Sequence, residues 1–132
     1  MFFKMRKALT LIELVITVSI LSLGIIMILR SFLSANTALV FSRNQIAASQ
    51  FLETKLAEAE EKADDPASLK EESNSGEVLL DGRVSARWET ELKYVEEEAL
   101  RNEMYCFKVK LVWSESGRER DLSAATYFKA KK

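Results

Sequence analysis

The chain has 132 residues, a formal charge of −1 and no histidine. This length suits one modest domain, and a nearly neutral chain without a broad basic surface is not expected to bind nucleic acid. Histidine is the commonest general base and the commonest transition-metal ligand, and the single cysteine, Cys106, cannot form an internal disulfide. We therefore expect no catalysis, and neither a metal ion nor another cofactor.

The N-terminal part begins with a basic segment and continues into an apolar one. Residues 1–8 contain three basic side chains and no acidic one, whereas residues 9–29 are almost entirely apolar. As a helix, these 21 residues would span roughly 30 Å, which is enough to cross the hydrocarbon core of a bilayer. The basic residues ahead of them predict a cytoplasmic N-terminus. The segment is longer than the apolar core of a cleaved secretory signal, so it predicts a retained, single-pass anchor.

The helical pattern continues well beyond the length that a membrane needs. No proline interrupts residues 9–63, and Pro66 then disfavours the helical conformation at Asp65. Small and apolar residues recur at steps of three and four, which predicts a face that packs on the rest of the protein: Phe32, Ala35, Leu39, Ser42, Ile46, Ser49, Leu52 and Leu56. The opposite side is predicted to be solvated: Arg43, Asn44, Gln50, Lys55, Glu58 and Glu61.

The second half of the chain has the alternation of β-strands. The predicted strands are residues 78–80, 84–94, 105–113 and 122–128. Asp81-Gly82 and residues 115–117 are predicted turns, and residues 96–103, which include four glutamates, are predicted to form a solvated connection or a helical turn. The apolar face of these strands needs a cover, and the helix is the element long enough to provide it. We predict an α+β fold with one long N-terminal helix packed on a small antiparallel sheet.

Three other residue types have a simpler structural interpretation than a functional one. Trp88 and Trp113 fall on the apolar faces of their strands, which favours core packing over partner binding. Cys106 falls on the opposite strand face and is expected to be a partly covered structural thiol. The aspartates at residues 64, 65 and 81 lack the spacing of a calcium loop and suit a helix end and a turn.

Glu13 is out of place, because it has apolar neighbours on both sides near the start of the predicted anchor. A carboxylate at bilayer depth costs on the order of 3 kcal/mol, so it should have a partner or a function. The alternative is that Glu13 lies close enough to the lipid headgroups to reach water. Its position alone does not decide between these interpretations.

The residues around Glu13 resemble the N-terminal signature of the type IV pilin superfamily. Its prepilins carry a short basic leader, a Gly-Phe-Thr-Leu-Ile-Glu-like string and an apolar helix, and the corresponding string here is Lys7-Ala8-Leu9-Thr10-Leu11-Ile12-Glu13-Leu14. The resemblance implies cleavage by prepilin peptidase between Ala8 and Leu9, and N-methylation of Leu9. It also implies that Glu13 meets the positive terminus of a neighbouring subunit. Ala8 stands where the family usually has Gly, and Leu9 where it usually has Phe.

This resemblance implies a layout and a location for the chain. Residues 1–8 are expected to be the cleaved leader and residues 9–29 the transmembrane part of the helix. Residues 30–65 are expected to be its periplasmic, amphipathic part, and residues 66–132 the sheet domain. The protein is then expected in the bacterial inner membrane with its C-terminal domain in the periplasm.

Residues 47–58 resemble the helix of the I class of minor pseudopilins of type II secretion. That resemblance implies a subunit that initiates or caps the periplasmic pseudopilus, the filament that drives export of folded proteins. The implied partners are other minor and major pseudopilins or pilins, prepilin peptidase and the inner-membrane assembly platform. A minor type IV pilus or competence pilin shares much of this pattern. An unrelated signal-anchored periplasmic adaptor would share the anchor but not the cleavage.

Overall fold

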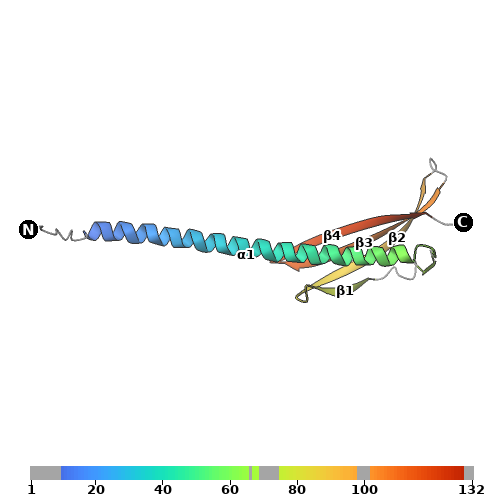
Figure 1. The fold of residues 1–132 in the computed structure, drawn as a ribbon, viewed down its shortest axis with the longest axis horizontal. Coiled ribbons are helices and arrows are strands. Elements are labelled where there is room, and N and C mark those ends of the chain that lie inside the picture. The colour runs from blue at the N-terminus through green and yellow to red at the C-terminus, as the bar shows by residue number, and fades with distance from the viewer. Residues whose placement is uncertain (1–9, 66, 69–74, 98–101, 130–132) are drawn as a thin grey trace, which may run out of the picture. The chain divides into compact units, whose positions relative to one another are not determined.

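The computed structural model describes residues 10–65, 67–68, 75–97 and 102–129 (Figure 1). In chain order its elements are α1 (Leu11–Glu61), β1 (Ser75–Leu80), β2 (Val84–Glu97), β3 (Asn102–Glu115) and β4 (Arg118–Lys129). The fold is α+β, with one long apolar N-terminal helix and a four-strand antiparallel sheet, as predicted. The chain divides into two compact units, residues 1–40 and residues 41–132.

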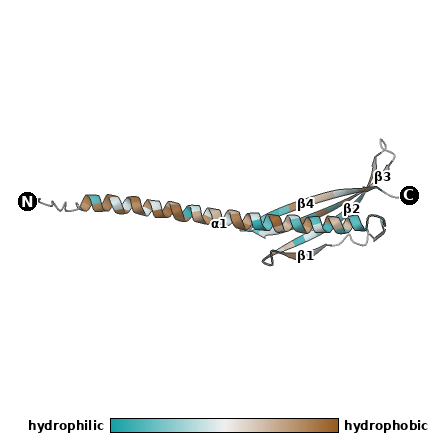
Figure 2. Cartoon of the chain, in the orientation of Figure 1, coloured by the Kyte–Doolittle hydropathy of each residue, from teal (hydrophilic) through white to brown (hydrophobic). Residues whose placement is uncertain are grey.

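Helix α1 is apolar over most of its first part, and hydrophilic residues become frequent in its later part (Figure 2). It ends at Glu61, where the backbone tightens: the amide of Ala63 donates to the carbonyl of Glu60, three residues earlier, at 3.2 Å, and that of Asp65 donates to Lys62 at 3.1 Å. Such shorter-range bonds use carbonyl groups that have no partner beyond a helix end. The Asp65 carboxylate then accepts a hydrogen bond from the amide of Ala67 at 3.0 Å, as aspartate does in turns.

The strands lie in the order β1-β2-β3-β4, so each pairs with its neighbour in sequence. Both outer hairpin turns contain a pair of residues with positive φ: Asp81 (49°) and Gly82 (65°), then Ser116 (52°) and Gly117 (75°). Paired left-handed residues match the twist of antiparallel strands, and glycine adopts this conformation without steric cost. Both predicted turns are therefore confirmed.

The strands are longer than the side-chain alternation predicts. Residues 96–103 were expected to form a solvated connection, but β2 runs through Glu97 and β3 begins at Asn102. Glu97 is the Cα partner of Asn102, and residues 98–101 lie outside the described part. The expectation of a connection at residues 96, 97, 102 and 103 was wrong, because backbone hydrogen bonds continue an antiparallel ladder whatever its side chains are.

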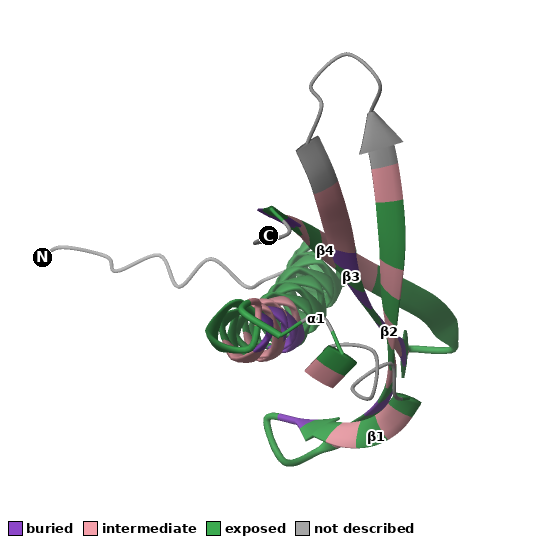
Figure 3. Cartoon of the chain, turned by 90° about the vertical axis from the view of Figure 1, so that its right-hand side faces the viewer, coloured by how far each residue is buried: buried purple, intermediate pink, exposed green. Residues whose placement is uncertain are grey.

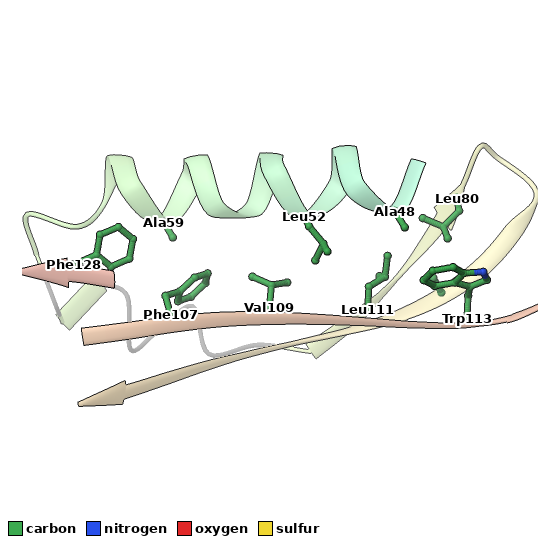
Figure 4. Close-up of a cluster of buried hydrophobic side chains, with 10 residues drawn as sticks. Ala48, Leu52, Ala59, Leu80, Phe107, Val109, Leu111, Trp113 and Phe128 are labelled. Carbon is green, nitrogen blue, oxygen red and sulfur yellow. The ribbon is translucent and has the colours of Figure 1, made fainter. Parts of the chain in front are cut away.

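The core lies between the later part of α1 and one face of the sheet (Figures 3 and 4). Its buried side chains are Ala48, Leu52, Ala59, Leu80, Ala86, Phe107, Val109, Leu111, Trp113 and Phe128. Trp113 is buried as predicted, whereas Trp88 is partly buried beside Phe51, with ring centroids 6.1 Å apart. All of these residues belong to the unit formed by residues 41–132.

The helix face that meets the sheet differs from the predicted one. Leu52 is buried as expected, but Ile46 is 55% exposed, and Asn44, expected in solvent, is buried. The buried residues of α1 are Asn44, Ala48, Leu52 and Ala59. Alanine lets the helix and the sheet approach closely, and Asn44 forms a hydrogen bond to the sheet. Steric fit and this polar contact therefore select the buried face, and side-chain hydrophobicity alone does not.

Candidate functional site

The start of α1 contains the candidate site, around Glu13. The amide of Glu13 donates a hydrogen bond to the Thr10 hydroxyl oxygen at 3.3 Å, so Thr10 caps the helix that begins at Leu11. Threonine followed three residues later by glutamate is the pattern of a capping box, and this spacing is readable from the sequence. Glu13 also lies in the first helical turn, where the helix dipole favours a negative charge.

The predicted processing residues, Ala8 and Leu9, lie outside the part of the chain that the structure describes. Cleavage between them and methylation of Leu9 therefore stay predictions. The described chain begins at Thr10, and Leu11 is already helical.

The hydroxyl side chains that interrupt the apolar segment all bond back to the helix. Thr17 donates to the carbonyl of Glu13, Ser19 to that of Val15 and Ser22 to that of Val18, each at 2.7 Å. A hydroxyl that donates to the carbonyl four residues earlier needs no water for that bond. These residues are therefore compatible with an apolar environment.

The Glu13 carboxylate is different. Among the described residues from Thr10 to Leu29, the Glu13 carboxylate is the one polar side-chain group without a hydrogen bond or an ion pair. Its surroundings are apolar, because the large apolar side chains from Leu11 to Leu29 are each between 48% and 81% exposed. A helix with such a surface needs an apolar environment, and within it Glu13 needs a positive partner or water.

By length and composition, α1 is a helix that could cross a membrane. It is the one such helix in the described part of the chain, and an N-terminal signal sequence would meet the same criterion. The helix is therefore a candidate anchor, and Glu13 lies within two residues of its first helical residue.

In the second unit, polar side chains fasten the helix to both hairpin turns. Asn44 Nδ2 donates to Glu115 Oε1 at 2.6 Å, next to the β3–β4 turn. Arg43 pairs with Asp81 in the β1–β2 turn, also at 2.6 Å. The apolar periodicity gave no sign of either contact, because their partners lie 71 and 38 residues away in the sequence.

The remaining candidates have structural roles here. Cys106 is free and partly buried on β3. Asp81 is a turn residue with an ion-pair partner, and no cluster of potential metal ligands occurs among the described residues.

Comparison with protein-family models, with curated proteins and with solved structures found no match for this chain. Its likeness to pilins therefore rests on the chain itself. A long apolar N-terminal helix whose later part packs on a four-strand antiparallel sheet is a pilin-like architecture.

Proposed function

We propose that this chain is a non-catalytic pilin-type subunit that is anchored in the bacterial inner membrane and assembles into a periplasmic filament through its N-terminal helix. The observation that carries the proposal is the Glu13 carboxylate, which forms no hydrogen bond or ion pair among the described residues, whereas the hydroxyls of Thr17, Ser19 and Ser22 in the same apolar segment bond to the helix backbone. The pilin-like architecture and the resemblance around Ala8, Leu9 and Glu13 support it.

Filament assembly would give the Glu13 carboxylate its partner. Cleavage between Ala8 and Leu9 creates a new amino terminus, and N-methylation leaves it basic. In an apolar environment the isolated carboxylate and the isolated amino terminus are each costly, and a close pair of the two removes much of that cost. A free subunit in the membrane would therefore be less favourable than one whose Glu13 meets the terminus of its neighbour.

Within this class we propose a minor pseudopilin of type II secretion, at the tip of the pseudopilus. The resemblance of residues 47–58 to the I class supports this assignment, and a lone cysteine cannot make the internal disulfide common in major pilins. Its partners would be other pseudopilins, prepilin peptidase and the inner-membrane assembly platform. Deletion of the gene should then abolish export of folded proteins, whereas loss of pili or of DNA uptake would indicate a minor type IV or competence pilin.

The decisive test is the mass of the protein isolated from cells with and without prepilin peptidase. We expect a mature chain that begins at methylated Leu9, present only in cells with the peptidase. Ala8→Gly restores the residue that is usual before the cut and should speed processing, which makes it a positive control. Retention of residues 1–8 in both strains would refute the proposal and favour an unrelated signal-anchored adaptor.

A further inference from the structure

The sheet has two edges without a strand partner in the described part of the chain, β1 and β4. The first residues of β4 carry charges that protect an edge, Arg118 to Asp121. The residues that follow, 122–128, contain no charge, proline or glycine. An uncharged edge segment of this kind readily pairs with another strand.

Each edge displays one large apolar side chain on the same face of the sheet. Leu79 on β1 and Tyr127 on β4 are both 61% exposed. Their neighbours Leu80 and Phe128 point into the core, so Leu79 and Tyr127 point away from α1. Besides Leu79 and Tyr127, only Tyr94 is an exposed large apolar side chain among the described residues outside α1.

The direction of the strands determines how two copies can meet. In an antiparallel sheet of four strands in sequential order, the two edge strands run in opposite directions. Copies with the same orientation therefore present β4 of one to β1 of the next as antiparallel partners. This step rests on the proposed function, because neighbouring subunits of one filament share an orientation; pairing of two β4 strands would turn one copy over.

The charges on the outer face select the register. Within one copy, the strand pairing places Glu77 of β1 in register with three residues of the other strands: Arg87 of β2, Val112 of β3 and Asp121 of β4. Two copies side by side at the same level would therefore place Glu77 of one beside Asp121 of the other, which is unfavourable. A shift of eight residues along β4, roughly 26 Å, instead places Glu77 beside Lys129. The same shift places Leu79 beside Tyr127.

We infer that residues 77–80 of β1 in one copy add to residues 126–129 at the β4 edge of another, with Glu77 opposite Lys129 and Leu79 opposite Tyr127. The inner-face positions agree, because Val78 then lies opposite Phe128. The contact joins two different surfaces, so each outer copy of a pair keeps one edge free.

Cysteine cross-linking tests this register in the full-length protein. Two differently tagged copies, both carrying Cys106→Ser, are co-expressed in cells with prepilin peptidase; one carries Leu79→Cys and the other Tyr127→Cys. Directly opposed positions on antiparallel strands lie within disulfide reach. We expect a mixed dimer on oxidation. The matched control replaces Tyr127→Cys with Ser123→Cys, on the same edge and face, and should give at least about five-fold less product because it lies four residues away.

A charge exchange tests the second pair in the same assay. Glu77→Lys in the copy with Leu79→Cys, or Lys129→Glu in the copy with Tyr127→Cys, should each lower the yield, and the two together should restore it. Equal yields at positions 123 and 127, or no mixed dimer, would overturn the strand pairing whether or not the chains are processed. The mass of the same sample reports cleavage at Ala8–Leu9 and so judges the pilin proposal separately.

Discussion

At the scale of single residues, Asn44 is the polar group on which the helix–sheet contact most depends. It is 4% exposed, and it donates to Glu115 at 2.6 Å. Asn44→Ala leaves a part-buried carboxylate without this donor, so we expect the free energy of unfolding to fall by about 1–3 kcal/mol. Chemical unfolding of the detergent-solubilised full-length chain measures it. Gln50→Ala, exposed on the same helix, is the control and should change stability by less than about 0.5 kcal/mol.

The pairing itself can be separated from the burial of Asn44 by a double-mutant cycle. Glu115→Ala and the double variant complete the set, and residues in direct contact usually show an interaction energy of at least about 0.5 kcal/mol. Strict additivity of the two single changes would show that Asn44 does not stabilise the fold through Glu115.

Trp113 should tolerate loss of its ring nitrogen. Its Nε1 is buried and has no hydrogen-bond partner in the described structure. Trp113→Phe removes this desolvated group along with part of the ring, so we expect a loss of less than about 1.5 kcal/mol in unfolding free energy. Trp113→Ala, which empties the site, should cost about 3–5 kcal/mol. Similar losses for the two variants would mean that the nitrogen is bonded after all, for example to a buried water.

At the scale of elements, close packing of α1 on the sheet depends on two alanines. Ala48 and Ala59 are completely buried against the sheet, whereas Ala57 on the same helix is exposed. Ala59→Leu must displace the helix or its neighbours, so we expect it to lower the unfolding free energy by about 1–3 kcal/mol. Ala57→Leu introduces the same side chain at an exposed position and should be nearly neutral. If both variants unfold alike, α1 does not pack on the sheet through Ala59.

The strands were predictable from sequence to a greater extent than the helix face. Period-two alternation and the Asp81-Gly82 pair located the hairpins, because both signals are local. The contact face of α1 depends on Asn44 and Ala48, whose partners are distant in sequence, so hydrophobic periodicity favoured Ile46 instead. The full length of β2 and β3 was not predicted for a related reason, since the backbone hydrogen bonds of the ladder leave no pattern in the side chains.

At the scale of the whole molecule, α1 combines a surface suited to an apolar environment with one group that is not. The hydroxyls of Thr17, Ser19 and Ser22 bond to the helix backbone, and the large apolar side chains from Leu11 to Leu29 are exposed in the described part of the chain. The sequence locates Glu13 as the exception but not what Glu13 meets, because the partner that we propose belongs to another molecule. The structure adds the Thr10 cap, which uses the backbone amide of Glu13 and leaves its carboxylate without a hydrogen bond among the described residues.

Glu13→Gln tests the charge separately from the cap, because glutamine keeps the backbone amide that bonds to Thr10 and also suits this position of a capping box, but carries no charge. If Glu13 neutralises a neighbouring terminus, the variant should be inserted and processed like the wild type. Its share of processed protein in the filament fraction should nevertheless fall at least about ten-fold, equivalent to about 1.4 kcal/mol. The measurement is the amount of processed chain that sediments with sheared filaments, relative to the amount in membranes. Thr10→Ala is the matched control: it removes the cap and keeps the charge, so it should assemble. Normal assembly of Glu13→Gln together with failure of Thr10→Ala would instead show that assembly depends on the capped start of the helix and not on the charge of Glu13.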